Sequence, residues 1–214
     1  MANVINNESS GWTLMIFGTI GAGTIGQAVA GHLVEAGQRV VLSNSRGPAT
    51  LDEVVARLGP LASAGTVAQA AAADMVFLTV MWPHIPAALA GLPPWDGRIL
   101  VDTTNQVARL DPIEAVDLGD QTGSEYVAAH APGARVIKAF NTLFARYIAP
   151  DPRHPAGRQV LFYAGDDAEA KATFHEVTDS LGFAPVDMGG LRDGGRLMQV
   201  GGGPLSALHA LKQD

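Results

Sequence analysis

Three glycines at the spacing Gly-x-Gly-x-x-Gly are the residues of this chain best suited to bind a phosphorylated ligand. Gly21, Gly23 and Gly26 follow the apolar run Leu14 to Ile20 and open a helical pattern that continues through Leu33-Val34. Such a turn lets the backbone approach a pyrophosphate closely. It also places the anion at a helix N-terminus, where unpaired N–H groups and the macrodipole favour negative charge. The sequence therefore predicts a dinucleotide site here.

The residues after the next apolar run favour a dinucleotide with a phosphorylated ribose. Gly37 is typical of a helix end, and Arg39 to Leu42 read as a second strand that leads into Ser43-Asn44-Ser45-Arg46. At this place NAD-binding chains carry an acidic residue, which binds the ribose 2′-OH and repels a 2′-phosphate. Here donors and a planar cation stand instead. We predict NADP(H); the alternative is a polar loop with one solvated arginine.

The composition limits the partners. The 214 residues carry 14 Lys and Arg against 21 Asp and Glu, for a net charge of −7, and include no cysteine. Nucleic-acid binding needs a basic face that this balance does not supply. Without cysteine, disulfides, thiolate nucleophiles and Cys-ligated metal centres are excluded. We find no signal peptide and no membrane span, and expect a cytoplasmic protein with residues 1–12 as a disordered tail.

Strand and helix patterns alternate along most of the chain, which predicts an α/β fold with a Rossmann-type, doubly wound, mostly parallel sheet. We expect an NADP-binding Rossmann domain over residues 13–150 and a small C-terminal extension over 151–214 that packs on the same domain. A short strand is expected near Thr66-Val67, and the last strand at Ala184 to Asp187. The other expected strands cover 14–20, 39–42, 75–80, 98–102, 135–139 and 160–164.

Several charged residues lie at or near strand ends. Lys138 lies within a strand, and we expect its side chain to reach the surface. Asp166-Asp167 stand where a helix starts and are expected to form its N-cap. Pro83 suits the first position of a helix and places His84 in the first turn. The spacing of the other histidines indicates no metal site.

With these motifs in place, the chain resembles the NADPH-dependent coenzyme F420 reductases, also called F420-dependent NADP oxidoreductases. The match spans most of the chain, and Lys-Ala-Phe-Asn-Thr at 138–142 is its most family-specific block. The other blocks are 21–26, 43–48, 78–84 and 164–167. The resemblance implies hydride transfer between NADPH and a stacked deazaflavin, coenzyme F420, with orientation rather than a catalytic side chain lowering the barrier.

The resemblance also assigns residues to the site. Thr24 and Ile25 look like pyrophosphate-binding backbone, and Ser43 to Arg46 like the 2′-phosphate clamp. Trp82 and His84 look like wall residues near the ribose and nicotinamide, while Asp102 either caps the following turn or contacts the acceptor. The predicted cofactor-binding set, with no catalytic residue and no metal ligand, is Gly21, Ala22, Gly23, Thr24, Ile25, Gly26, Ser43, Asn44, Ser45, Arg46, Val80, Met81, Trp82, His84, Asn105, Ala139 and Asn141.

Other functions stay open at this point. One is a flavin-dependent ferric reductase-like enzyme, because the same fold occurs in membrane metalloreductases. Another is a module that senses NADP(H) without turnover, since the fold alone does not fix activity. A β-hydroxyacid dehydrogenase or imine reductase ranks lower, because those families add a long helical domain. Gly201 to Pro204 break any helix, which departs from a pocket built of C-terminal helices. The resemblance also favours a homodimer that acts on a small-molecule hydride acceptor.

Overall fold

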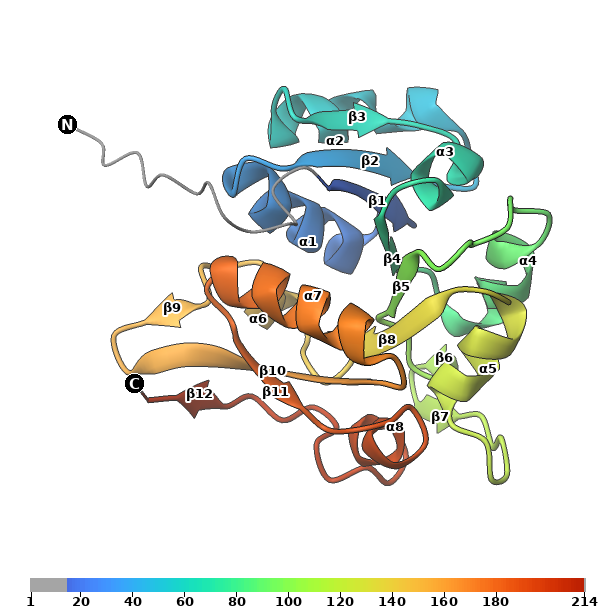
Figure 1. Cartoon of the computed structure of the whole chain (residues 1–214), viewed down its shortest axis with the longest axis vertical. Coiled ribbons are helices and arrows are strands. Elements are labelled where there is room, and N and C mark those ends of the chain that lie inside the picture. The colour runs from blue at the N-terminus through green and yellow to red at the C-terminus, as the bar shows by residue number, and fades with distance from the viewer. Residues whose placement is uncertain (1–14, 214) are drawn as a thin grey trace.

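A mostly parallel sheet runs through the molecule, with helices on both faces (Figure 1). The computed structural model describes residues 15–213, so the expected tail over 1–12 and the start of the first expected strand lie outside the described residues. The order of the main strands is β11-β10-β8-β5-β4-β1-β2-β3. From β1 the chain continues to β2 and β3 on one side, and then crosses to β4 on the other side of β1. Open α/β sheets bind ligands in the crevice at such a change of direction.

The six strands on the β3 side are mutually parallel, and β10 joins them antiparallel to β8. The segment after residue 151 therefore continues the same sheet, because β11 lies parallel to β10, while β9 and β12 pair with its first residues. The strands of this sheet are β1 Ile16–Ile20, β2 Arg39–Ser43, β3 Ala62–Ala64, β4 Met75–Leu78, β5 Ile99–Asp102, β8 Arg135–Ala139, β9 Arg153–His154, β10 Gly157–Gly165, β11 Ala184–Asp187 and β12 Leu211–Lys212.

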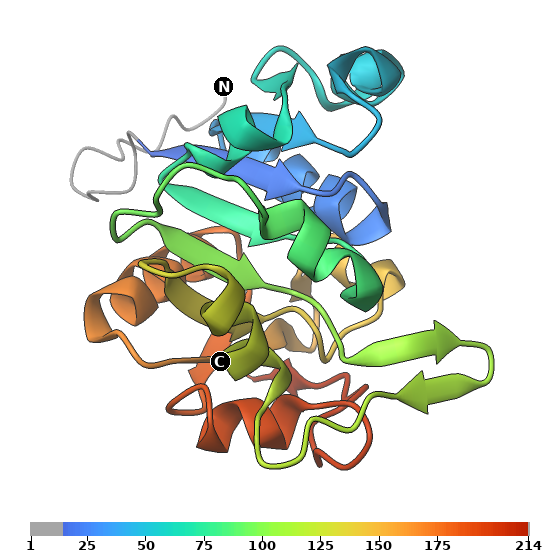
Figure 2. The ribbon, with the colours of Figure 1, turned by 90° about the vertical axis from the view of Figure 1, so that its right-hand side faces the viewer.

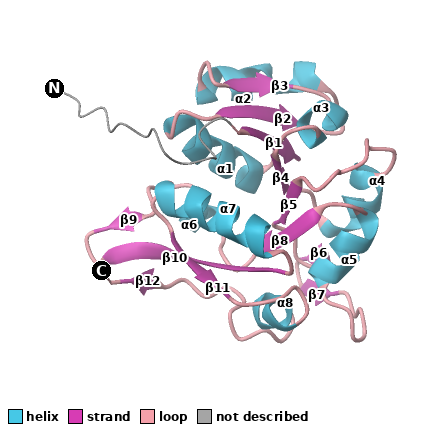
Figure 3. Ribbon diagram, in the orientation of Figure 1, coloured by secondary structure: helices cyan, strands magenta, loops and turns pink. Residues whose placement is uncertain are grey.

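Two apolar cores lie on the two faces of the sheet, which helices cover (Figure 3). On one face Phe17 packs with Leu33 of α1 and Phe174 of α7. On the other, Val76 packs with Ile85 of α4 and Val127 of α5. Besides the 3-10 turns Pro48–Leu51 and Trp82–His84, the helices are α1 Thr24–Glu35, α2 Asp52–Leu58, α3 Val67–Ala71, α4 Ile85–Leu89, α5 Gly123–His130, α6 Ala145–Ile148, α7 Ala168–Ser180 and α8 Asp193–Met198.

The predicted fold class is confirmed, but the expected strand near Thr66-Val67 is wrong. The strand in this part of the chain is β3, and Thr66 begins α3 instead. Its hydroxyl accepts a hydrogen bond from the Gln69 backbone N–H, and the Gln69 side chain accepts one from the Thr66 N–H. This reciprocal capping box stabilises a helix start, which outweighs the β propensity of the threonine-valine pair.

The structure also contains a second sheet, which is antiparallel and which the sequence patterns did not predict. Strands β6 Val107–Leu110 and β7 Ile113–Ala115 form a hairpin that projects from the body of the molecule (Figure 2). Ile113 is exposed, so the hairpin lacks the alternation of buried and exposed residues by which strands are predicted. Strand β12 was also missed, and Ala184 to Asp187 is therefore not the last strand.

A buried ion pair joins the carboxyl ends of β5 and β8. Asp102 and Lys138 are register partners on these parallel strands, and Lys138 Nζ lies 2.9 Å from Asp102 Oδ2. The exposed side-chain fractions are 4% for the lysine and 0% for the aspartate. The expectation that Lys138 reaches the surface is wrong, because a carboxylate on the neighbouring strand and the carbonyl of Thr104 hold its ammonium group inside.

Asp102 uses both carboxylate oxygens in this network. Oδ1 accepts hydrogen bonds from the Thr104 N–H at 2.8 Å and hydroxyl at 2.7 Å. Oδ2 accepts one from the Ser124 hydroxyl at 3.0 Å in addition to the lysine. Of the two roles expected for Asp102, capping the turn after β5 is the one that the geometry shows.

Replacing Lys138 with Met should destabilise the fold strongly. The change leaves the Asp102 carboxylate buried without its cation, a loss of about 3–5 kcal/mol in the free energy of unfolding. The matched control is Arg109→Met, which breaks an ion pair with Glu114 whose side chains are both 60% exposed. That change should cost less than about 1 kcal/mol. Urea denaturation measures both, and equal losses would contradict the assignment of a structural role to the buried pair.

Candidate functional site

The glycine turn after β1 is fixed by close backbone contacts. Gly21 has φ +106°, and its N–H donates to the Ser43 carbonyl at 3.1 Å. A Cβ on Gly26 would lie 2.6 Å from the Gly21 oxygen and 2.7 Å from Thr79 Oγ1. The first and last glycines of the motif therefore serve the tight turn and the close helix packing, as predicted.

Thr79 is a supporting residue that the sequence reading missed. It follows β4, and its hydroxyl donates to the Gly21 carbonyl at 2.8 Å. This bond ties the glycine turn to the neighbouring strand. Its position directly after an apolar strand at the carboxyl edge of the sheet was the available signal.

The N-terminus of α1 presents uncapped backbone donors. Gly23 is the N-cap residue, no side chain caps this end, and the first turn contains no acidic residue. A Cβ built on Gly23 would have no heavy atom within 4 Å, so space is open in front of the helix. Thr24 is exposed, while Ala22 and Ile25 are half-buried. This cradle fits a pyrophosphate, whose charge the free N–H groups and the helix dipole would balance.

The side chain of Arg57 lies close to the glycine turn. Gln27 Nε2 donates to the Ala22 carbonyl at 2.7 Å, and Arg57 Nη2 donates to Gln27 Oε1 at 2.6 Å. Arg57 is exposed and comes from α2, so the fold brings a guanidinium to the first turn of α1. No pattern in the sequence predicts this contact, because α2 carries no binding motif.

The loop after β2 divides into shaping and exposed residues. Ser43 is fully buried, and its hydroxyl donates to the Thr19 carbonyl at 2.7 Å, so this side chain is not free to bind a phosphate. Asn44 accepts the Arg46 N–H at 2.9 Å and donates to Thr50 Oγ1 at 2.9 Å, which holds the loop in shape. The donors left for a ligand are on Ser45 and Arg46, which are exposed.

Arg46 has no side-chain hydrogen bond or ion pair with any residue between 15 and 213. Arg46 follows the last residue of β2 by three positions, and no carboxylate between residues 15 and 213 forms an ion pair with its guanidinium. A guanidinium matches a phosphate group with two parallel hydrogen bonds. The predicted clamp is therefore smaller than the sequence indicated, with Arg46 as its charged member.

The predicted wall residues after β4 differ in exposure. Met81 is 48% exposed and His84 is also exposed, whereas Val80 is half-buried. Trp82 is only 7% exposed, and its ring packs against Tyr126 with 4.8 Å between centroids. Met81 and His84 are thus exposed enough to contact a ligand, whereas Trp82 mainly stabilises the loop by packing against Tyr126.

The predicted residues after β5 and β8 form one hydrogen-bonded unit. Asn105 Nδ2 donates to the Asn141 carbonyl at 3.0 Å, and Asn141 Nδ2 donates to Asn105 Oδ1 at 3.1 Å. Asn141 is 6% exposed, and Ala139 is fully buried. Ala139 therefore offers no surface to a ligand in this conformation, and the contact of all three residues with a cofactor stays a prediction.

Comparison with known proteins gives a family match for the first half of the sheet. The model of the coenzyme F420-dependent NADP oxidoreductases matches residues 16–106. A hypothetical protein from Sinorhizobium meliloti is 39% identical, with a TM-score of 0.88 over 94% of this chain and 97% of that one. Residues 16–106 therefore match a family of NADP-dependent oxidoreductases. A candidate F420-dependent NADP reductase from an Arthrobacter species is 26% identical, with a TM-score of 0.73 over 83% of this chain and 86% of that one.

A curated relative is a metalloreductase. The metalloreductase STEAP3 of Rattus norvegicus is 34% identical over 177 residues, which are 81% of this chain and 34% of the relative. The chain thus spans about a third of the length of this relative. Within residues 15–213 no helix is long and apolar enough to cross a bilayer. The same residues contain no group of three or more His, Cys, Asp or Glu side chains arranged to hold a metal ion.

Gly26→Ala should weaken NADPH binding, because the added methyl group would collide with the Gly21 carbonyl and displace the turn. We expect the Kd to rise about tenfold or more, which is about 1.4 kcal/mol. Gly31→Ala is the matched control on the same helix, since its Cβ would meet only Leu58 Cδ2 at 3.8 Å. It should leave the Kd unchanged and raise stability by about 0.5–1 kcal/mol. Calorimetric titration measures the Kd of both variants, and urea denaturation measures the stability of Gly31→Ala. Equal affinities of the two variants for NADPH would refute the role of Gly26.

Arg46→Ala should weaken the binding of NADPH and leave that of NADH nearly unchanged. Loss of a charge-assisted hydrogen bond to phosphate costs about 1.5–3 kcal/mol, or at least about tenfold in Kd. Arg39→Ala is the control, because Arg39 is an exposed arginine at the opposite end of the same strand. A parallel loss of affinity for both dinucleotides would show that Arg46 does not read the 2′-phosphate.

Proposed function

We propose that this chain transfers a hydride between NADPH and a flat acceptor that stacks on the nicotinamide, with a deazaflavin of the coenzyme F420 type as the acceptor. The observation that carries the proposal is the pairing of an uncapped helix N-terminus with an uncompensated arginine beside the next strand. The match of residues 16–106 to the NADP oxidoreductase family supports the reaction type. The acceptor rests on the resemblance and on the family description.

The chain's residues have distinct tasks in this reaction. When bound, NADPH supplies the hydride. The first turn of α1 holds the pyrophosphate, and Arg46 with Ser45 holds the 2′-phosphate. Gln27 and Thr79 keep the glycine turn in place through their bonds to its carbonyls. Because both the pyrophosphate and the 2′-phosphate are held, the nicotinamide end of the dinucleotide is oriented toward the carboxyl ends of β4, β5 and β8.

At the reactive end we assign Met81 and His84 to one wall and the Asn105–Asn141 pair to the other. These groups would orient the two rings and exclude water. Orientation alone can supply about 7–11 kcal/mol of barrier lowering, so no general acid or base is required. Lys138 takes no part in proton transfer, because its ammonium group is buried against Asp102 and Thr104.

A second candidate acceptor is a flavin that passes electrons to ferric ion. The named activity of STEAP3, a metalloreductase, favours this alternative. A module that binds NADP(H) without turnover is a third possibility and enters as an outcome of the test. A cytoplasmic location and a homodimer, both expected from the sequence, also remain proposals; sedimentation of the purified protein tests the dimer.

The decisive experiment mixes the protein with NADPH and each acceptor and follows the nicotinamide absorbance. Oxidation with a deazaflavin supports the main proposal, and oxidation only with flavin plus ferric ion supports the second. Tight binding without oxidation by any acceptor supports the sensor and overturns the reductase. Substituting NADH should lower the rate at least about tenfold, because the contact with Arg46 is lost. The Arg46→Ala variant should show no such preference.

A further inference from the structure

Asn141 carries a buried hydrogen-bond acceptor that no donor between residues 15 and 213 reaches. Its Nδ2 donates two hydrogen bonds, whereas its Oδ1 is buried and has no partner within these residues. The whole residue is 6% exposed. A buried, unpaired amide oxygen costs free energy, and such groups in native proteins are usually paired in some functional state. Asn141 thus lies at the reactive end of the proposed site, but its side chain is buried and cannot reach a ligand in this conformation.

The segment Met198–Gly203, which begins at the last residue of α8 and which we call the strap, is hydrogen-bonded to this side chain. Asn141 Nδ2 donates to the Met198 carbonyl at 2.8 Å. Gln106 Nε2, from the turn after β5, donates to the Val200 carbonyl at 3.1 Å. The Gly123 N–H at the start of α5 donates to Gln199 Oε1 at 3.4 Å. Hydrogen bonds from three neighbouring segments therefore hold the strap across the carboxyl edge of the sheet.

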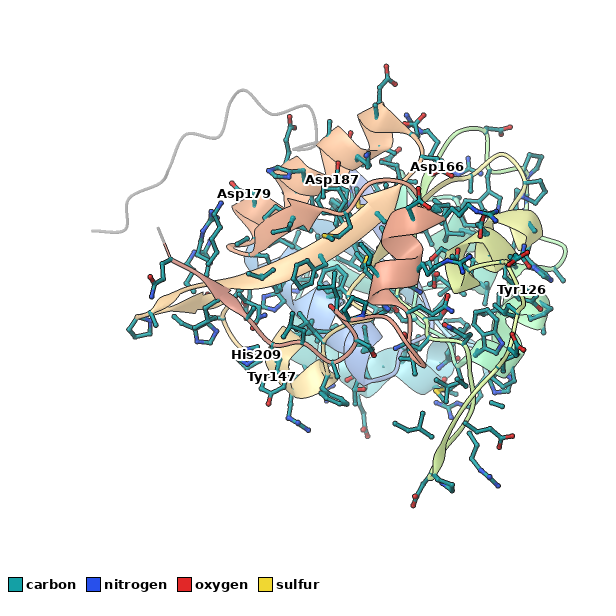
Figure 4. All side chains as sticks on the ribbon, turned by 90° about the horizontal axis from the view of Figure 1, so that it is seen from below. Tyr126, Tyr147, Asp166, Asp179, Asp187 and His209 are labelled. Atoms are coloured by element: carbon teal, nitrogen blue, oxygen red, sulfur yellow. The ribbon has the colours of Figure 1, made fainter. Side chains whose placement is uncertain are left out.

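The strap is weakly packed between two firm anchors. Met198 is fully buried at one end. Beyond the other end, His209 stacks on Tyr147 at 4.1 Å, and β12 then pairs with β10 (Figure 4). Between the anchors, Gly201 and Gly202 are exposed and have φ +91° and +155°. Few buried contacts and glycine backbone are the features of segments that open without unfolding the rest of a protein.

The strap is separate from the dinucleotide elements. Within the described part of the chain, no hydrogen bond joins residues 198–203 to the glycine turn at 21–26 or to the loop at 43–46. Opening of the strap would therefore leave the pyrophosphate cradle and Arg46 in place.

We propose that the strap is a gate on the acceptor side of the site. It opens to admit the hydride acceptor and to free Asn141 Oδ1, which then accepts a hydrogen bond from an N–H or O–H group of that acceptor. NADP(H) binds whether the gate is closed or open. This inference rests on the proposed function, because it takes the carboxyl ends of β5 and β8 as the acceptor's place.

A disulfide clip tests the gate. The variant Ala115→Cys with Gly201→Cys would join β7 to the strap, because a Cβ on Gly201 would lie 3.1 Å from Ala115 Cβ. Disulfide-linked Cβ atoms lie about 3.5–4.5 Å apart, so a shift of a few tenths of an ångström suffices. Both positions are exposed, and the chain has no other cysteine. Because Gly201 has φ +91°, a cysteine there strains the backbone, so the single variant Gly201→Cys controls for that strain and for oxidation, and Ala115→Cys controls for the other substitution.

The oxidised clip should bind NADPH with a Kd within about twofold of the reduced form but oxidise it with acceptor at least about tenfold more slowly. Dithiothreitol should restore the rate. Equal rates for the oxidised and reduced forms would overturn the gate. An equal loss of NADPH binding would overturn it as well, because the strap would then control the whole site.

Hydrogen exchange separates failure of the gate from failure of the proposed function. The Gly123 N–H of α5 donates to Gln199 Oε1 of the strap at 3.4 Å, so this amide loses its partner when the strap opens. It should exchange at least about tenfold faster than the buried Phe174 amide of α7, and the clip should slow it. Equal rates at Gly123 and Phe174 would refute separate opening, with or without an activity. Fast exchange at Gly123 in a protein that oxidises no NADPH would refute the reductase instead.

Discussion

The buried pair of Lys138 and Asp102 is the constraint on which the reactive end of the site depends. A charge without a partner is very costly inside a protein, so each of these groups requires the other at its position in the register of β5 and β8. The bonds from Asp102 to Thr104 and Ser124 extend this requirement to the turn after β5 and to α5. Asn105 and Asn141 stand one and three residues beyond the members of this network, and their positions follow from it.

The two ends of the proposed site are built from different interactions. At the adenosine end, the proposed contacts are mostly with backbone groups at the glycine turn, and one arginine adds charge. At the reactive end, side-chain amides bond to one another and to the strap. A backbone cradle is insensitive to most substitutions except those that add a Cβ, whereas a network of side chains changes with each replacement. Relatives with this fold can therefore share a coenzyme and differ in acceptor.

The sequence predicted the backbone-determined part of the molecule well. Glycine spacing, apolar strand runs and the Asp167 N-cap of α7 have local causes, and the structure confirms them. The predictions were wrong where a residue far away in the sequence determines the position of a side chain. Lys138 lies inside because Asp102 faces it across the sheet, and Ser43 is occupied by the Thr19 carbonyl. Arg57 reaches the glycine turn through Gln27, a contact between two helices that no local pattern encodes. The Thr66 capping box, in contrast, was readable from the spacing Thr-x-x-Gln and was overlooked.

Strand β10 has a consequence for how this protein can be divided. It lies against β8 and also supports β9, β11 and β12, so the last quarter of the chain is part of the same sheet rather than an appendage. A fragment ending before β10 would leave the backbone groups along one side of β8 bare, a surface that invites aggregation. Chimaeras that exchange acceptor preference between relatives should therefore carry β10 and everything after it as a single cassette.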